Sequence, residues 1–193
     1  NWELNSPDLT NGGKPGNVAF GTLTAIHESP MRFGLLYAGS DDGALHVSKD
    51  GGYNWTKIDA GLPQNLWVSR VQASAHQLDR VYVSLNGYRN DDFTSYLYVS
   101  EDQGNTWNRI GKNLPMEPIN VVREDPTNEH LLFVGTDHGV YASLDRGATF
   151  FSVGKDLPAV AVHDLLIHQK TGDLVLGTHG RSLYVGNIKY LQQ

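Results

Sequence analysis

The stretch Ser48-Lys49-Asp50-Gly51-Gly52-Tyr53-Asn54-Trp55 has two further copies in this chain. They are Ser100-Glu101-Asp102-Gln103-Gly104-Asn105-Thr106-Trp107 and Ser143-Leu144-Asp145-Arg146-Gly147-Ala148-Thr149-Phe150. All three share the frame Ser-x-Asp-x-Gly-x-(Asn/Thr)-aromatic. A motif that recurs at intervals of roughly 40 to 50 residues indicates a repeat protein. We therefore expect the fold to be built from one repeated unit.

The residue types in this motif are those of a tight turn next to a packing site. An aspartate can accept backbone N–H bonds across a turn, and a glycine supplies a positive φ. The aromatic side chain can pack between neighbouring repeats. A carboxylate that occurs in every repeat is not what a single active site needs. The motif residues are therefore predicted to be structural: Asp50, Gly52, Trp55, Asp102, Gly104, Trp107, Asp145, Gly147 and Phe150.

A leucine follows each motif aromatic at a distance of seven residues. Trp55, Trp107 and Phe150 are followed in this way by Leu62-Pro63, Leu114-Pro115 and Leu157-Pro158. Trp2 is followed at the same distance by Leu9, with Thr10 in place of the proline. Residues 1–10 are therefore predicted to be the last, outer strand of a further copy of the repeat.

Each complete repeat contains four short runs rich in Val, Ile, Leu, Tyr and Thr, separated by turn residues, which is the pattern of strands. In the third repeat these runs are 119–123, 131–135, 139–143 and 149–153. No stretch has the pattern of an amphipathic helix. Four antiparallel strands in about 45 residues are the unit of a β-propeller blade. The all-β chain is thus expected to hold about four blades of one propeller. Residues 18–63, 64–115 and 116–158 are each a blade, residues 159–193 are an incomplete blade, and residues 1–10 are the outer strand of a shared blade.

The last repeat has three strand-like runs, at 162–167, 174–177 and 182–185, and no motif follows them. Residues 1–5 could supply the missing strand, because propellers often close by sharing a blade between the two ends of the chain. Three arrangements follow: a small closed ring, two chains that form one larger ring, or an arc of a longer propeller. The start of the chain inside a motif favours the arc.

Composition excludes several classes of function. The net charge is −6 and no basic run is present, which argues against nucleic-acid binding. The chain has no cysteine, so disulfides and thiolate metal sites are excluded. No apolar stretch approaches membrane-spanning length, and no nucleotide or phosphate motif is present, so neither membrane insertion nor a cofactor is expected.

The repeated motif resembles the Asp-box, or bacterial neuraminidase repeat, of sialidases, xyloglucanases and sortilin-type receptor domains. Further stretches resemble bacterial sortilin-like propellers that carry glycosyl hydrolase labels, and this chain is similar to their C-terminal half. The resemblance implies a secreted or periplasmic protein. The stretches that carry it are 21–26, 67–71, 89–93, 121–126 and 177–182.

Ligands of a propeller usually bind on the face formed by the loops, because loops on a rigid scaffold carry function. The 86–96 loop is the longest link of its kind, and its aromatic residues could stack on a sugar or a peptide. We expect a ligand site that includes Trp67, Tyr88, Arg89, Asp91, Asp92, His138, His179 and Arg181.

Glycoside hydrolysis requires two carboxyl groups on either side of the scissile bond. Asp91 and Asp92 are the candidates, and Asp41, Asp42 and Asp164 also lie in loops or links of this face. A sialidase is disfavoured, since no pattern brings three arginines together. His138 and His179 occupy comparable loops and could converge, but a metal site is not predicted.

Two functions remain open, besides a structural arc whose function lies in another part of a longer chain. The first is a carbohydrate-associated module, similar to a glycoside hydrolase, that binds a polysaccharide or oligosaccharide on the loop face. The alternative is a non-catalytic propeller that binds a protein or peptide, like the sortilin receptor domain or an assembly factor. Self-association, or completion by the rest of a larger propeller, is compatible with both.

Overall fold

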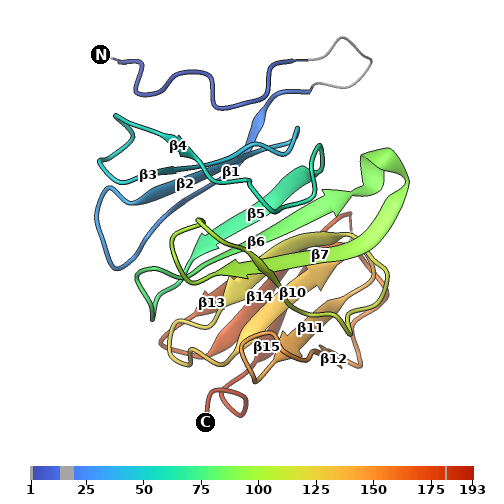
Figure 1. Cartoon of the computed structure of the whole chain (residues 1–193). Coiled ribbons are helices and arrows are strands. Elements are labelled where there is room, and N and C mark those ends of the chain that lie inside the picture. The colour runs from blue at the N-terminus through green and yellow to red at the C-terminus, as the bar shows by residue number, and fades with distance from the viewer. Residues whose placement is uncertain (1, 14–19, 181) are drawn as a thin grey trace. The chain divides into compact units, whose positions relative to one another are not determined.

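The computed structural model describes residues 2–13, 20–180 and 182–193, and its regular structure is almost entirely β (Figure 1). The chain forms two compact units, Asn1–Leu85 with Tyr98–Asn108, and Asn86–Leu97 with Arg109–Gln193. Within the described residues, the sole helical element is the 3-10 turn Tyr88–Asn90. No helix in this part of the chain has the length and apolar character needed to cross a membrane.

In the described part of the chain, fifteen strands form four antiparallel sheets, each in simple sequence order. The first sheet contains β1 (Leu23–Glu28), β2 (Leu36–Ser40), β3 (Leu45–Ser48) and β4 (Thr56–Lys57). The second contains β5 (Trp67–Ala73), β6 (Val81–Gly87), β7 (Asp92–Ser100) and β8 (Asn108–Arg109). The third contains β9 (Ile119–Glu124), β10 (Leu132–Thr136), β11 (Val140–Ser143) and β12 (Phe151–Val153). The fourth contains β13 (Val162–His168), β14 (Asp173–Thr178) and β15 (Leu183–Asn187).

This topology confirms the predicted all-β architecture of repeated antiparallel blades. The outer strands are short, with two or three residues each in β4, β8 and β12. The fourth sheet has three strands, and the described residues 2–10 form no strand. The sharing of an outer strand between residues 1–10 and the last sheet therefore stays a prediction.

In the first unit, β1 and β2 pack against β5. The side chains of Tyr37 and Val68 are fully buried. Gly39 of β2 permits a close approach of the two sheets, because a Cβ atom at this position would lie 2.3 Å from Cγ1 of Val68. Sheet-on-sheet stacking of successive repeats thus makes the core.

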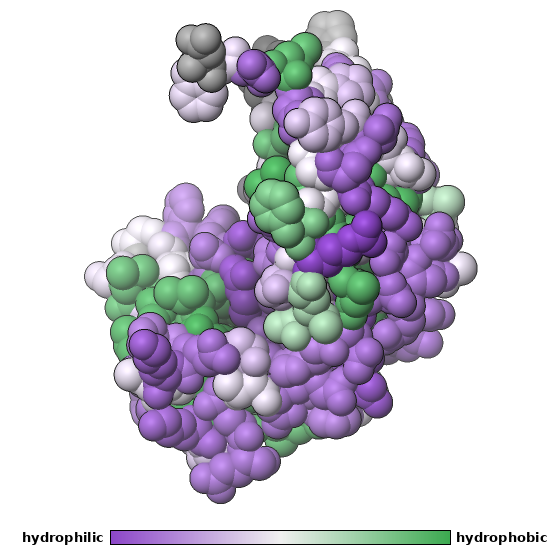
Figure 2. Space-filling model, turned by 90° about the vertical axis from the view of Figure 1, so that its left-hand side faces the viewer, coloured by the Kyte–Doolittle hydropathy of each residue, from purple (hydrophilic) through white to green (hydrophobic). Residues whose placement is uncertain are grey.

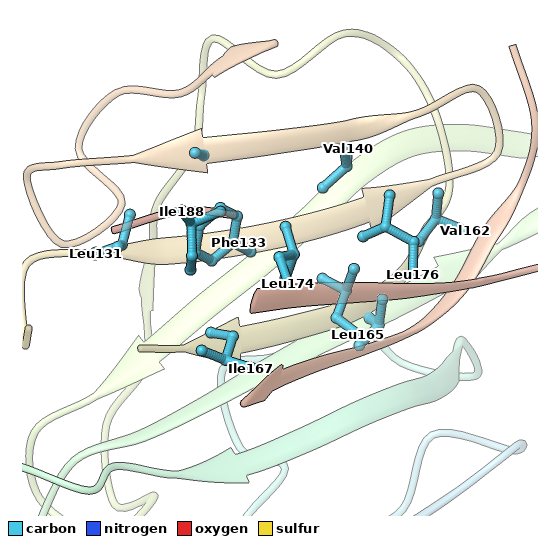
Figure 3. Packing of buried hydrophobic residues seen from close by; sticks show 11 residues of the cluster. Leu131, Phe133, Val140, Val162, Leu165, Ile167, Leu174, Leu176 and Ile188 are labelled. Carbon is cyan, nitrogen blue, oxygen red and sulfur yellow. The ribbon is translucent and has the colours of Figure 1, made fainter. Parts of the chain in front are cut away.

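In the second unit, the core lies between the third and fourth sheets. Phe133 and Leu131 of the third repeat and Leu165 and Leu176 of the fourth are almost fully buried in one cluster. Figure 3 shows these side chains pointing toward one another from their strands, together with Ile188, which follows β15. Burying an aliphatic or aromatic side chain of this size contributes about 1.5–3 kcal/mol. This core holds the loops of the second unit in place.

Some large apolar side chains remain at the surface, and Figure 2 shows hydrophobic residues exposed among hydrophilic ones. Leu166 of β13 and Val185 of β15 are 61% and 66% exposed. Both pair with Val175 of β14, so the three form one apolar row across the sheet. This face of the last sheet lacks the cover that the inner sheets have.

Candidate functional site

The repeated turn has the same hydrogen bonds in all three copies. In the second copy, Ser100 Oγ donates to Asp102 Oδ1 at 2.7 Å, and the N–H of Thr106 donates to the same oxygen at 2.8 Å. Thr106 Oγ1 donates to Asp102 Oδ2 at 2.7 Å, and the N–H of Gly104 donates to Ser100 Oγ at 2.7 Å. The equivalent bonds in the other copies lie within 0.2 Å of these lengths and involve Ser48, Asp50, Gly52 and Asn54, and Ser143, Asp145, Gly147 and Thr149.

These bonds keep the three carboxyl groups ionised. Hydrogen bonds from Ser100 and Thr106 lower the pKa of Asp102, and hydrogen bonds from Asn54 lower the pKa of Asp50. Burial opposes the charged form of Asp145, but its hydrogen bonds outweigh burial and its pKa is also lowered. An ionised carboxylate whose oxygens already accept several hydrogen bonds suits a turn better than proton transfer.

The motif aromatics of the second and third repeats contact the segment after the outer strand of the preceding repeat. Trp107 Nε1 donates to the carbonyl oxygen of Ile58 at 2.7 Å. Phe150 is buried, and its ring lies beside Gly111. Trp55 differs, because its Nε1 donates to the carbonyl oxygen of Gly52 within its own turn, at 2.7 Å.

The 86–96 loop is a hairpin between β6 and β7, drawn in green in Figure 1. Strand β6 is buried along its whole length, so it anchors one side of the hairpin. The 3-10 turn is followed by its C-cap residue, Asp91, which has a left-handed backbone with φ of 55°. This turn brings Tyr88 and Phe93 together edge to face, with ring centroids 6.2 Å apart and planes at 77°. Both rings are exposed at the surface.

Asp92 is held inside the hairpin by polar contacts. The N–H of Thr94 donates to Oδ1 at 3.0 Å, and the hydroxyl of Tyr96 donates to Oδ2 at 2.8 Å. The N–H bond from Thr94 is the main cause of a lowered pKa at Asp92, and burial acts against it. The guanidinium of Arg109 lies 5.5 Å from the centre of the Tyr96 ring. Asp92 is therefore a poor general acid, whereas Asp91 beside it is exposed.

Buried side-chain amides that are linked by hydrogen bonds support the hairpin. The N–H of Tyr88 donates to Asn86 Oδ1 at 2.9 Å, and Asn86 Nδ2 donates to Asn120 Oδ1 at 3.1 Å. Asn120 Nδ2 in turn donates to Asp137 Oδ1 at 2.9 Å. These amides thus connect the hairpin to the loop between β10 and β11 of the next repeat.

A second polar group lies in that next repeat. Thr136 Oγ1 donates to Glu117 Oε2 at 2.6 Å, and Nδ1 of His138 lies 3.6 Å from Glu117 Oε1. Glu117 and Asn86 are not among the site residues predicted from the sequence. Asn86 follows a run of strand residues where an apolar side chain would be expected, and a polar residue there is a signal for a buried hydrogen bond.

The remaining predicted residues fall into separate places. His179 lies against His163, with ring centroids 5.2 Å apart, and Arg123 pairs with Asp164 at 3.4 Å. The described residues contain no group of three or more His, Asp or Glu side chains that could hold a metal ion.

Trp67 begins β5 in the first unit and is half-buried, while Arg181 lies outside the described residues. Asp41 and Asp42 are buried, and both carboxylates accept hydrogen bonds from backbone N–H groups. Asp41 Oδ1 accepts the N–H groups of Gly21 and Thr22 at 2.9 and 2.8 Å, so it stabilises a turn and is not available as a catalytic carboxylate. The residues that the structure brings together as a site are Tyr88, Arg89, Asp91, Asp92 and Phe93.

Neither a protein-family model nor a curated protein matches the chain. Solved structures do match its fold. The GH74 xyloglucanase from Xanthomonas campestris has a TM-score of 0.67 and 18% identity over 93% of this chain and 30% of that one. YCF48 bound to D1 peptide has a TM-score of 0.58 and 12% identity over 84% and 49%. The computationally designed Ika4 protein has a TM-score of 0.59 and 14% identity over 86% and 91%.

These similarities show the fold: the chain consists of β-propeller blades. It spans under a third of the GH74 chains that it matches. The matched structures include enzymes and a peptide complex, so the fold does not select one function.

Proposed function

We propose that the chain is a carbohydrate-binding propeller module and that the β6–β7 hairpin is its ligand site. The observation that carries the proposal is the exposed pair of Tyr88 and Phe93, held edge to face on a buried polar support. The C–H face of a pyranose packs on aromatic rings of this kind. Because the rings are already oriented, little conformational entropy is lost on binding.

Polar groups around the rings suit the hydroxyl groups of a sugar. Arg89 and Asp91 are exposed in the same turn as Tyr88. An aromatic platform with a few directional polar groups is the usual composition of a small-molecule site. The solved structures titled as GH74 enzymes and as a xyloglucanase make β-glucan chains the first ligands to test.

Hydrolysis is a further part of this proposal, with Asp91 as one carboxyl group and the second one, which the reaction requires, supplied from outside this hairpin. Asp92 already accepts hydrogen bonds from Thr94 and Tyr96, so it serves to shape the hairpin. The motif geometry also supports membership among Asp-box proteins of the sortilin-like kind, with the secreted or periplasmic location that this implies.

The alternative is a protein-interaction propeller. The observation in its favour is that the same fold is seen in YCF48 bound to D1 peptide. An edge-to-face aromatic pair can also hold an apolar side chain of a peptide. The two functions differ in their ligand and not in the surface used.

The test is calorimetric titration of the whole chain with xyloglucan oligosaccharides and with a panel of other glycans. The double variant Tyr88→Ala, Phe93→Ala is expected to bind at least about tenfold more weakly. The control is Phe33→Ala, an aromatic outside the hairpin that is 94% exposed, against 61% for Tyr88 and 44% for Phe93. Equal binding by the double variant would overturn the choice of site. Binding of peptides with no glycan bound would support the alternative. Release of reducing ends that is lost in Asp91→Asn would establish hydrolysis.

A further inference from the structure

Each inner repeat covers the end of the repeat before it with its motif aromatic. The third repeat is the clearest case. Phe150 is 7% exposed and lies over Gly111 and Leu114 of the second repeat. A Cβ atom built on Gly111 would lie 2.8 Å from Leu114 and 3.1 Å from Phe150. The segment after an outer strand thus provides a glycine and a leucine as a seat for the next aromatic ring.

The same seat occurs one repeat later, where no motif aromatic follows to cover it. Gly154 and Leu157 occupy the positions of Gly111 and Leu114, counted from Phe150 and from Trp107. A cavity of about 280 Å³ lies there. Leu157 is half-buried, whereas Leu114 is buried. The residues that line the cavity are Gly154, Asp156, Leu157, Leu176, Tyr184, Val185 and Gly186.

The open edge of β15 borders this cavity. Strands β3, β7 and β11 each pair with a short outer strand, but the sheet of β15 ends with β15 itself. Val185 and Gly186 of β15 are exposed. An exposed strand edge with free backbone groups beside an apolar pocket is the arrangement that accepts an added strand.

The segment that fits this edge is residues 2–9 of the chain. Asn5 follows Trp2 by three residues and lies against Gly52, since a Cβ on that glycine would be 2.5 Å from Asn5 Nδ2. Ile58 and Gly104 make the equivalent contact one repeat later, at 2.4 Å from Ile58 Cδ1.

Leu9 is buried to the same degree as its counterpart Leu62, with 4% and 6% exposed. Residues 5–9 therefore already lie as they would after an outer strand. Trp2 and Leu4 are 104% and 94% exposed, so the strand itself and its aromatic ring have no sheet to join.

We propose that the cavity beside β15 accepts Trp2 from a second copy of this chain, with Glu3 and Leu4 added to β15 as its fourth strand. The ring of Trp2 is fully exposed. Each copy has one such strand and one such edge, so two copies can satisfy both at two equal interfaces, with closed two-fold symmetry. The apolar row of Leu166, Val175 and Val185 lies on the same sheet and would be covered in the pair.

The first experiment is light scattering of the whole chain over a range of concentrations. The expected mass is twice 21.3 kDa. Trp2→Ala is expected to weaken the dimer at least about thirtyfold, because a buried tryptophan is a typical anchor of an interface. Phe33→Ala removes another exposed aromatic ring and is expected to leave the dimer intact.

A second variant tests the acceptor without touching the donor. A Cβ on Gly186 would meet nothing within 4 Å, so Gly186→Val leaves the single chain folded and fills part of the cavity. It is expected to weaken the dimer as Trp2→Ala does. Gly139→Val is the matched control, at a glycine with equal open space that does not line the cavity. Circular dichroism checks that each variant is folded.

A peptide with the sequence of residues 2–9 completes the test. Added in excess, it should convert the dimer into monomers and shift its own tryptophan emission to shorter wavelength. A dimer that survives both Trp2→Ala and Gly186→Val would overturn the proposal. A monomer with solvent-exposed Trp2 emission would overturn it as well. A monomer in which Trp2→Ala removes blue-shifted emission would show that the strand closes on its own chain.

Discussion

The motif turns and the β6–β7 hairpin both present aspartates at the surface, but they use them differently. Asp50, Asp102 and Asp145 have the same set of hydrogen bonds, copied three times with nearly equal lengths. Asp91 and Asp92 occur once, in a turn that the other repeats lack. Asp92 shapes the hairpin, whereas Asp91 is exposed.

This difference separates residues with a structural role from residues that are candidates for a functional role. A contact that recurs in every repeat solves a problem that every repeat has, which is to close the turn and seat an aromatic ring. A feature that departs from the repeat has no such explanation. The hairpin with its exposed Tyr88 and Phe93 is the clearest departure in the described chain.

The largest expected effect comes from the motif glycine. Gly104→Ala places a side chain at φ of 91° and 2.4 Å from Cδ1 of Ile58. Backbone strain and overpacking together should lower the free energy of unfolding by about 2–4 kcal/mol. Urea denaturation measures this. Gly139→Ala, where the space is open and φ is not positive, should change it little. Equal losses in the two variants would mean that the turn does not depend on its glycine.

The buried support of the hairpin should show a smaller effect. Asn120→Ala removes the donor to Asp137 and the acceptor for Asn86, which leaves polar groups unpaired inside the protein. The expected loss is about 1–3 kcal/mol. Binding at the hairpin should weaken with it, because the Asn86 bond to the Tyr88 N–H loses its anchor.

Asn108→Ala is the control for this prediction, since Asn108 is exposed in the outer strand β8. Urea denaturation and glycan titration are measured on both variants. Full stability of Asn120→Ala would show that the buried amides do not hold the hairpin. Lost stability with unchanged glycan binding would show that the binding site does not depend on the buried amides that support the hairpin.

Most of the fold could be predicted from the sequence, because the pattern of each strand recurs in several repeats. The third repeat was expected at 119–123, 131–135, 139–143 and 149–153, and its strands begin within two residues of these limits. The chemistry of Asp and Gly in a turn also anticipates the backbone N–H bond that Asp102 accepts and the positive φ of Gly104.

The site was less predictable, since side chains in different loops meet only through the fold. The sequence did not indicate that Asn86 would donate a hydrogen bond to Asn120, or that Asp92 would accept one from Tyr96. His138 and His179 looked comparable by position, yet one lies against Glu117 and the other against His163. Strand register and loop direction decide such contacts, and neither follows from composition.

The smallest expected effect concerns acid, and it tests whether the motif carboxylates stabilise the fold as ions. The pKa values of Asp50, Asp102 and Asp145 are lowered in the folded chain. A carboxyl group with a lowered folded pKa stabilises the fold above its unfolded pKa, and this contribution is lost as the pH falls through the folded pKa. Stability should therefore decrease from about pH 5 to about pH 3.

Replacing all three motif aspartates by asparagine keeps an oxygen acceptor in each turn and removes the titration. The triple variant should thus lose less stability than the wild type over this range, as measured by the urea midpoint at each pH. Asp91→Asn, at an exposed aspartate of the hairpin, should keep the wild-type slope. If the triple variant and the wild type have the same slope, the recurring carboxylates close their turns by geometry and not by charge, and the contrast with the hairpin rests on Tyr88 and Phe93 alone.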